Sequence, residues 1–124
     1  MIAVQASGAP AAYQSRKTGE LVALPTVGTI AEGVATREMA SLPAAIMRRY
    51  LDDFVLVSDA DLQRSILTLL ETTRMLAEGA GAAALAAVAG MRDHLAGKTV
   101  AIVLSGGNFT LGGLKDALAL EQPW

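Results

Sequence analysis

The chain opens with a short, mostly apolar run, Ile2–Gln5, and a turn of small residues and proline follows it. A run of this length predicts a strand, and the turn favours a helix over Ala11–Arg16 that Gly19 ends. The next apolar stretch, Leu21–Ile30, contains both proline and glycine. We therefore expect an irregular or partly extended connection there.

Helical spacing of side chains returns between Ser41 and Asp53. One face of the expected helix carries residues that lie three and four positions apart, namely Leu42, Ala45, Ile46, Arg49 and Tyr50. We expect Ser41 to cap this helix, because serine is a favoured N-cap residue and Pro43 is tolerated in the first turn.

A strand that leads directly into a helix is predicted in the middle of the chain. Phe54–Val57 is an aromatic and β-branched run, and Ser58 and Asp61 follow it with the spacing of a capping box. The helix continues to Thr73 with apolar residues on one face and polar residues on the other. This is the most regular amphipathic pattern in the sequence.

Glycine breaks alternate with apolar runs in the last third of the chain. Residues 78–81, Glu-Gly-Ala-Gly, interrupt the helical pattern, and Ala82–Met91 resumes it as an almost uncharged helix that must be buried on most sides. Lys98–Leu104 is a continuous apolar run, typical of a strand buried on both faces of a parallel sheet, and it ends in Ser-Gly-Gly-Asn at 105–108. Strands separated by helices predict an α/β fold with a partial, open, mostly parallel sheet and flanking helices.

Composition indicates a single domain, residues 1–124, and excludes several functions. Of these residues 52% are hydrophobic and only 4% aromatic, which favours an aliphatic core and argues against disorder. A net charge of −2, with the charges scattered, gives no electrostatic footprint for a nucleic acid. The absence of cysteine and the single histidine exclude disulfides and multi-histidine metal sites. We expect no membrane span and no export signal, and hence a cytoplasmic location.

Three turns that contain glycine are candidates for chemistry. They lie at residues 29–33, 78–81 and 105–108. Taken alone, the first is best explained as a solvated loop and the second as a helix kink, whereas a strand-end turn without a ligand explains the third as well as a binding site does. Chemically, Ser105 offers a hydroxyl, and Glu78 stands where a helix begins and backbone N–H groups are free. In parallel α/β sheets, ligands bind beyond the carboxyl ends of the strands, which is where the last turn would lie.

Together, the order and spacing of four segments resemble the C-terminal part of the threonine dehydratase (threonine ammonia-lyase) catalytic domain. These segments are Thr-Ile-Ala-Glu-Gly at 29–33, the stretch from Tyr-Leu-Asp-Asp to Val-Leu-Val-Ser at 50–58, Glu-Gly-Ala-Gly-Ala at 78–82, and Leu-Ser-Gly-Gly-Asn at 104–108. The group includes serine/threonine dehydratases and serine racemases, which are fold-type II pyridoxal-phosphate (PLP) enzymes. The resemblance covers Ile2 to about Leu118 and implies a fragment of the tryptophan synthase β-like fold.

The resemblance also implies a cofactor and the residues around it. In that family PLP forms a Schiff base with a lysine and serves as the electron sink when L-threonine or L-serine is deaminated to a 2-oxo acid and ammonia. By resemblance, the Ser105 hydroxyl would bond the pyridine nitrogen, and the Gly33 backbone would pack against the ring. Glu78 would close the other flank of the cofactor, while Gly106 and Gly107 belong to the turn that holds the serine. No catalytic residue is implied in this chain.

Two features of the family are missing from the sequence. The Schiff-base lysine of a Ser-x-Lys motif and the glycine run that holds the phosphate have no counterpart, and the lysines present stand in other contexts, at Lys17, Lys98 and Lys115. Some members bind a divalent ion through acidic residues, but Gln5–Ala12 contains none, so we expect no metal. The resemblance thus implies a portion of a lyase that is inactive and does not bind PLP by itself.

Two hypotheses about function remain open from the sequence. In the first, the chain is the C-terminal portion of a threonine dehydratase-like lyase for an amino-acid substrate, and a complementary N-terminal chain supplies the lysine. In the second, it is a non-catalytic binding or self-association module on the same scaffold, since a strongly aliphatic chain with an exposed apolar face invites a partner. In either case, part of the apolar surface is expected to be covered by protein outside this chain.

Overall fold

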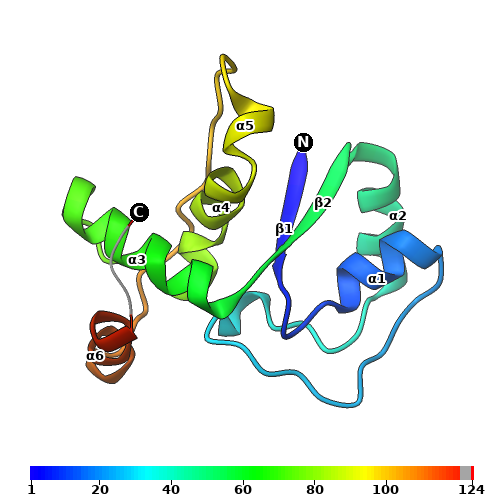
Figure 1. Ribbon diagram of the computed structural model, residues 1–124. Helices are drawn as coiled ribbons and strands as arrows, with labels where there is room; N and C mark the ends of the chain where they lie inside the picture. Colours follow the sequence, from blue (N-terminus) through cyan, green and yellow to red (C-terminus); the bar gives the residue numbers. More distant parts are fainter. Residues whose placement is uncertain (121–123) are drawn as a thin grey trace.

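Two parallel strands lie at the centre of the computed structural model, which describes residues 1–120 and 124 (Figure 1). Strand β1 (Ile2–Ala6) pairs with β2 (Asp53–Val57), and the register places Ile2 opposite Asp53 and Ala6 opposite Val57. Each strand leads through a short turn into a helix, as the sequence predicts for the two strand–helix units. The predicted α/β class is confirmed by this arrangement.

Helices cover both faces of the two strands (Figure 1). On one side lie α1 (Ala11–Thr18) and α2 (Ser41–Tyr50), and on the other lie α3 (Asp59–Thr73) and α4 (Gly79–Gly90). The remaining elements are the 3-10 turn η1 (Glu32–Val34), the short α5 (Arg92–Leu95) and α6 (Leu111–Leu120). Described residues contain no helix that is long and apolar enough to cross a membrane.

The core lies between the strands and α4, and it is built mainly from small side chains. Ala6 and Val57 of the strands pack with Leu62 of α3 and with Ala83, Ala86 and Ala87 of α4. Alanine lets the helix axis approach the sheet closely. Helix α4 has no polar face, and it is accordingly buried on much of its surface. The sequence predicts this burial from the almost uncharged composition of the helix.

The opposite face of the strands packs against α1. Phe54 of β2 makes an edge-to-face contact with Tyr13 of α1, with ring centroids 5.8 Å apart. Gln5, which is 4% exposed, points the same way, and its Oε1 accepts a hydrogen bond from the Tyr13 backbone N–H at 3.1 Å. This bond gives a partner to the side-chain oxygen of Gln5, the one polar residue in the first strand.

Two helix boundaries follow the sequence signals. The Ser58 hydroxyl caps α3 by accepting from the Asp61 backbone N–H at 3.2 Å, and the Asp61 carboxylate accepts in return from the Ser58 backbone N–H at 3.4 Å. Helix α1 ends at Gly19, whose φ of 82° lies in the left-handed region that glycine adopts without strain. Both the capping box and this helix end are therefore confirmed.

The start of α2 differs from the prediction. Ser41 is the first helical residue and not the cap, because Ala40 occupies the N-cap position and no side chain caps this helix. The helix ends at Tyr50 rather than at Asp53, since Asp53 already pairs with Ile2 in the parallel ladder. Sheet pairing therefore decides the end of this helix.

The predicted strand over Lys98–Leu104 is wrong. These residues lack regular secondary structure, and no described segment forms a β-ladder with them. Residues 98–103 are exposed, with 43% exposure for Val100 and 75% for Val103, and only Leu104 of this run is half-buried. A strand needs a hydrogen-bonding neighbour at its edge, and the residues described here place none beside this run.

Candidate functional site

The three turns singled out in the sequence meet around the first turn of α4. Glu78, the N-cap of α4, donates its backbone N–H to the Gly106 carbonyl at 3.1 Å. A Cβ placed on Gly33 would lie 3.1 Å from the Ala80 Cβ, so η1 also touches this turn. Segments that are more than twenty residues apart in the sequence therefore form one surface.

Glycine is required on both sides of the first turn of α4. A Cβ on Gly79 would lie 2.9 Å from the Ile30 carbonyl oxygen, and a Cβ on Gly81 would lie 2.5 Å from the Gly106 carbonyl oxygen. Both clashes involve backbone atoms, which cannot rotate away as a flexible side chain could. The Glu-Gly-Ala-Gly sequence thus allows α4 to begin between the two loops.

Asp59 holds the loop that carries the first of these turns. Its carboxylate accepts from the Thr29 hydroxyl at 2.5 Å and from the Ile30 backbone N–H at 3.2 Å. The Thr29 hydroxyl oxygen in turn accepts from the Ala31 N–H at 3.2 Å. Sequence analysis did not identify Asp59 as a site residue; the only available signal was that Asp61 completes the capping box and leaves Asp59 unassigned.

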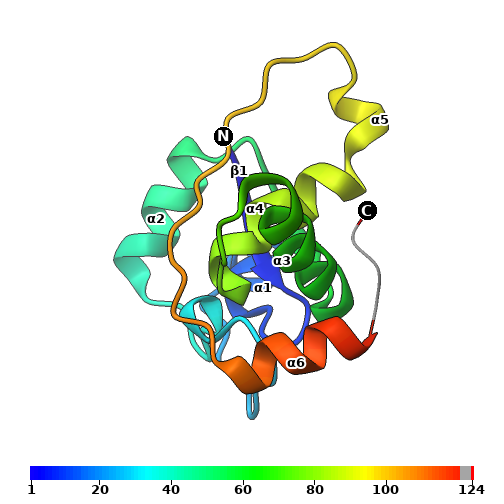
Figure 2. The same ribbon diagram turned by 90° about the vertical axis from the view of Figure 1, so that its left-hand side faces the viewer.

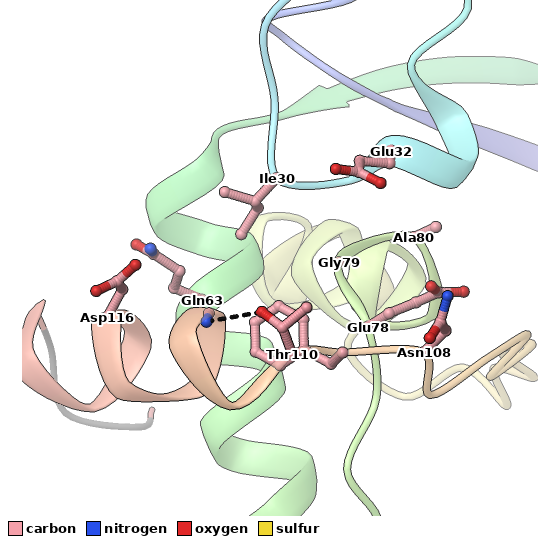
Figure 3. Close-up of a pocket in the computed structure, with 11 residues that line it drawn as sticks. Ile30, Glu32, Gln63, Glu78, Gly79, Ala80, Asn108, Thr110 and Asp116 are labelled. Carbon is pink, nitrogen blue, oxygen red and sulfur yellow. Dashed lines mark hydrogen bonds between the residues drawn. The ribbon is translucent and has the colours of Figure 1, made fainter.

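A pocket of about 240 Å³ opens beside the first turn of α4 (Figure 3). Three carboxylates line it, from Glu32, Glu78 and Asp116, together with the polar side chains of Gln63, Asn108 and Thr110. No lysine or arginine is among the described lining residues. The pocket therefore has an acidic wall that favours cations or amines over anions.

The proposed cofactor residues lie close together but are not all in this pocket. Glu78 lines it, whereas Gly33, Ser105, Gly106 and Gly107 do not. Ser105 and Gly107 are exposed, and Gly106 is half-buried against Glu78. The roles of these five residues toward a cofactor remain predictions.

None of the three lysines is among the residues that line the pocket. Lys17 belongs to α1, where its ammonium lies 5.9 Å from the centre of the Tyr13 ring, and Lys115 belongs to α6. Lys98 follows α5. The part of the chain that the structure describes also contains no group of three or more histidine, cysteine or acidic side chains placed to hold a metal ion.

Comparison with known proteins identifies the family. A family model described as pyridoxal-phosphate dependent enzyme matches residues 1–106. The chain is 41% identical to an L-threonine ammonia-lyase of Geobacter sulfurreducens over 87% of its own length and 27% of the relative. It is 34% identical to a biosynthetic L-threonine dehydratase of Halalkalibacterium halodurans over 94% of its own length and 28% of the relative.

The fold agrees with the sequence comparison. The processed form of threonine deaminase isoform 2 from Solanum lycopersicum superimposes with a TM-score of 0.87 at 29% identity, over 96% of this chain and 33% of that chain. This chain therefore has part of a fold-type II architecture, as predicted, and it spans little more than a quarter of the length of these curated relatives. The chain belongs to the pyridoxal-phosphate dependent enzyme family.

Proposed function

We propose that this chain is the C-terminal portion of the catalytic domain of a threonine dehydratase-like lyase, which deaminates L-threonine or L-serine to a 2-oxo acid and ammonia. The observation that carries the proposal is the similarity of the chain, at 34–41% identity, to relatives named as a threonine dehydratase and a threonine ammonia-lyase. The match of residues 1–106 to the pyridoxal-phosphate dependent enzyme family agrees with it. The convergence of the three turns at the start of α4 supports it, because they form one continuous surface.

The residues of this chain do not by themselves fit the complete PLP cofactor. PLP needs an amine for its aldehyde and positive or N–H partners for its phosphate. The described pocket offers three carboxylates and no basic side chain, and a phosphate dianion is repelled by Glu32 and Glu78 at close range. We therefore propose that the isolated chain neither binds PLP nor catalyses the reaction.

The chain would instead supply one wall of a shared site. Ser105 is exposed, so its hydroxyl is accessible to a group held mainly by another part of the enzyme. Gly33 lies against Ala80 and Gly106 lies against Glu78, both in the first turn of α4, so the two glycines border the same part of the structure. In this proposal Ser105 and Gly33 contact the cofactor ring, and Glu78, Gly106 and Gly107 shape the wall.

Complementation tests the proposal. The part of the Geobacter sulfurreducens L-threonine ammonia-lyase that precedes its matching region is produced as a separate polypeptide and mixed with this chain, PLP and L-threonine. We expect 2-oxobutanoate from the mixture and none from this chain alone. A stable complex of the two polypeptides that yields no product would contradict the proposed function.

A matched pair of variants assigns the activity to the proposed wall. Ser105→Ala removes one exposed hydroxyl, and we expect it to lower the rate of the mixture. Ser41→Ala removes another exposed hydroxyl on α2, on the other side of the strands, and should leave the rate unchanged. Equal rates for the Ser105 variant and the parent chain would show that Ser105 has no role at the site.

A further inference from the structure

The segment of residues 29–33 forms one side of the pocket at the start of α4. Ile30 and Glu32 lie on the upper side of the pocket in Figure 3, and Asn108 lies below them. In the proposed function, Gly33 at the end of this segment contacts the cofactor ring. A shift of the segment relative to α4 would therefore change both the shape of the pocket and the position of Gly33.

The other side of the site is bonded directly to α4. Figure 2 shows residues 98–110 running from α5 past α4 to α6. At the turn in this run, the Gly106 carbonyl accepts a hydrogen bond from the Glu78 N–H at 3.1 Å. A backbone bond to the start of α4 therefore fixes the turn that carries Ser105.

The 29–33 segment has no backbone bond of this kind to α4 in the described part of the chain. Its bonds close η1 instead, because the Ala31 and Glu32 carbonyls accept from the N–H groups of residues 34 and 35. Its contact with α4 is a close approach, in which the Ile30 carbonyl oxygen would lie 2.9 Å from a Cβ on Gly79. Such packing limits how near the segment comes to α4 but does not bond it in place.

The Asp59 carboxylate holds the segment from a different helix, α3. One of its oxygens accepts from the Thr29 hydroxyl at 2.5 Å, and the other accepts from the Ile30 N–H at 3.2 Å. Two bonds from one carboxylate to neighbouring residues fix both the position and the orientation of the segment. Asp59 is available for this contact because Ser58 and Asp61 make the capping box of α3.

We propose that Asp59 is a positioning residue for the lyase reaction: its two bonds hold the 29–33 segment so that Gly33 and the turn at Ser105 keep the spacing that the cofactor ring needs. Asp59 is not among the residues that line the pocket, so it acts on the site through the segment. This inference rests on the proposed function, because the cofactor is bound only when the complementary polypeptide is present.

Kinetics of the complemented mixture test this role. The mixture contains this chain, the preceding part of the Geobacter sulfurreducens enzyme, saturating PLP and L-threonine. We expect Asp59→Ala to lower kcat by about tenfold to a hundredfold, since a displacement of about 1 Å in a positioning contact costs a rate factor of this order. The absorption maximum of the bound cofactor should also shift, because the ring loses a neighbour on one side.

Ser58→Ala is the matched control for stability. Ser58 precedes Asp59 and caps the same helix, but its side-chain hydrogen bonds stay within residues 58–61. A purely structural role for Asp59 predicts that both variants lose activity in proportion to their loss in free energy of unfolding. We expect Ser58→Ala to keep the kcat of the parent chain in the saturated complex. Equal kcat values for Asp59→Ala and Ser58→Ala overturn the inference.

Asp59→Asn separates the contacts of this side chain from its charge. The asparagine oxygen can accept from the Ile30 N–H while its NH2 group donates to the Thr29 hydroxyl oxygen, so both contacts persist. We expect this variant to recover most of the parent kcat. A kcat as low as that of Asp59→Ala overturns the inference, because the contacts then do not determine the rate.

A variant at the other end of the contact keeps the test decisive if Asp59→Ala does not fold. Thr29→Val removes the hydroxyl that donates to Asp59 and leaves the Ile30 N–H bond in place. We expect it to lower kcat in the same direction as Asp59→Ala and by a smaller factor. A parent-like kcat for Thr29→Val in a complex that forms normally overturns the inference.

The positioning role and the proposed function fail in different ways. Product formation at a kcat that Asp59→Ala leaves unchanged contradicts the positioning role and supports the function. A parent mixture that binds PLP without making 2-oxobutanoate contradicts the function; a lower PLP affinity with Asp59→Ala then supports the positioning role, and an equal affinity overturns it. A mixture that binds no PLP overturns both.

Discussion

At the scale of single residues, the small side chains of α4 decide how three distant segments meet. Gly79 and Gly81 lie against backbone atoms of Ile30 and Gly106, whereas Gly90 near the end of the same helix has open space around its Cα. Helix α4 therefore contains two required glycines, Gly79 and Gly81, and a dispensable one, Gly90. Substitutions at the two kinds of position should have opposite effects on stability.

We expect Gly81→Ala to destabilise the fold by about 1–3 kcal/mol, because its Cβ would lie 2.5 Å from the Gly106 carbonyl oxygen and displace the turn that holds Ser105. Gly90→Ala should stabilise the fold by about 0.5–1 kcal/mol, since alanine has the higher helix propensity and meets no atom. Urea unfolding followed by circular dichroism measures both. A stabilising Gly81→Ala would mean that α4 does not pack against this turn.

Asp59 is another residue whose importance depends on its contacts with a remote segment of the chain. Asp59→Ala removes the acceptor of both the Thr29 hydroxyl and the Ile30 N–H, so we expect a loss of about 1–2 kcal/mol in the free energy of unfolding. Amide exchange in residues 29–33 should become faster while exchange in α3 stays unchanged. Thr29→Ser keeps the hydroxyl donor and is the control, and unaltered exchange in the loop of the alanine variant would rule out this anchoring role.

At the scale of elements, local signals in the sequence were sufficient to predict a helix boundary where the residues that form the boundary are neighbours in the sequence. The capping box at Ser58 needs only residues 58–61, and Gly19 ends α1 through its own φ. The start of α6 also has a local signal, since the Thr110 hydroxyl accepts from the Gly113 N–H at 3.0 Å. Sequence analysis missed this helix because glycine occupies two positions of its first turn, at 112 and 113.

The capping box provides a prediction at this scale. Ser58→Ala should cost about 1 kcal/mol, because the Asp61 N–H loses its acceptor and the start of α3 is left uncapped. Thermal or urea unfolding measures the change, and Ser58→Asp should restore most of it, since an aspartate carboxylate also caps a helix. A neutral effect of the alanine variant would indicate that sheet packing alone positions the start of α3.

Residues 98–104 show where local signals fail. The pattern there predicts a buried strand, and the chain supplies the right residues and direction, but a strand exists only when another strand bonds to it. The predicted end of α2 fails for a related reason, because Asp53 pairs with Ile2 in the sheet and the helix therefore stops at Tyr50. Both errors concern contacts that lie outside the segment itself.

At the scale of the whole molecule, the acidic pocket predicts how the chain behaves alone. Equilibrium dialysis should show no saturable binding of PLP to the isolated chain, because Glu32, Glu78 and Asp116 line the pocket and no basic side chain among the described residues joins them. Addition of the complementary polypeptide should create a saturable site. Stoichiometric binding by the isolated chain that Ser105→Ala weakens would contradict this expectation.

The sequence by itself determined the class of fold, the family resemblance and the segments that carry it, because these depend on residue types and their order. Helical spacing, the capping box and the three turns are local or ordered patterns, and a single sequence contains them completely. Only the tertiary structure decided which of these segments touch, that Asp59 holds the loop at Thr29, and that residues 98–104 remain unpaired. Close approaches and strand pairing depend on distances between remote residues, and those distances exist only once the chain has folded.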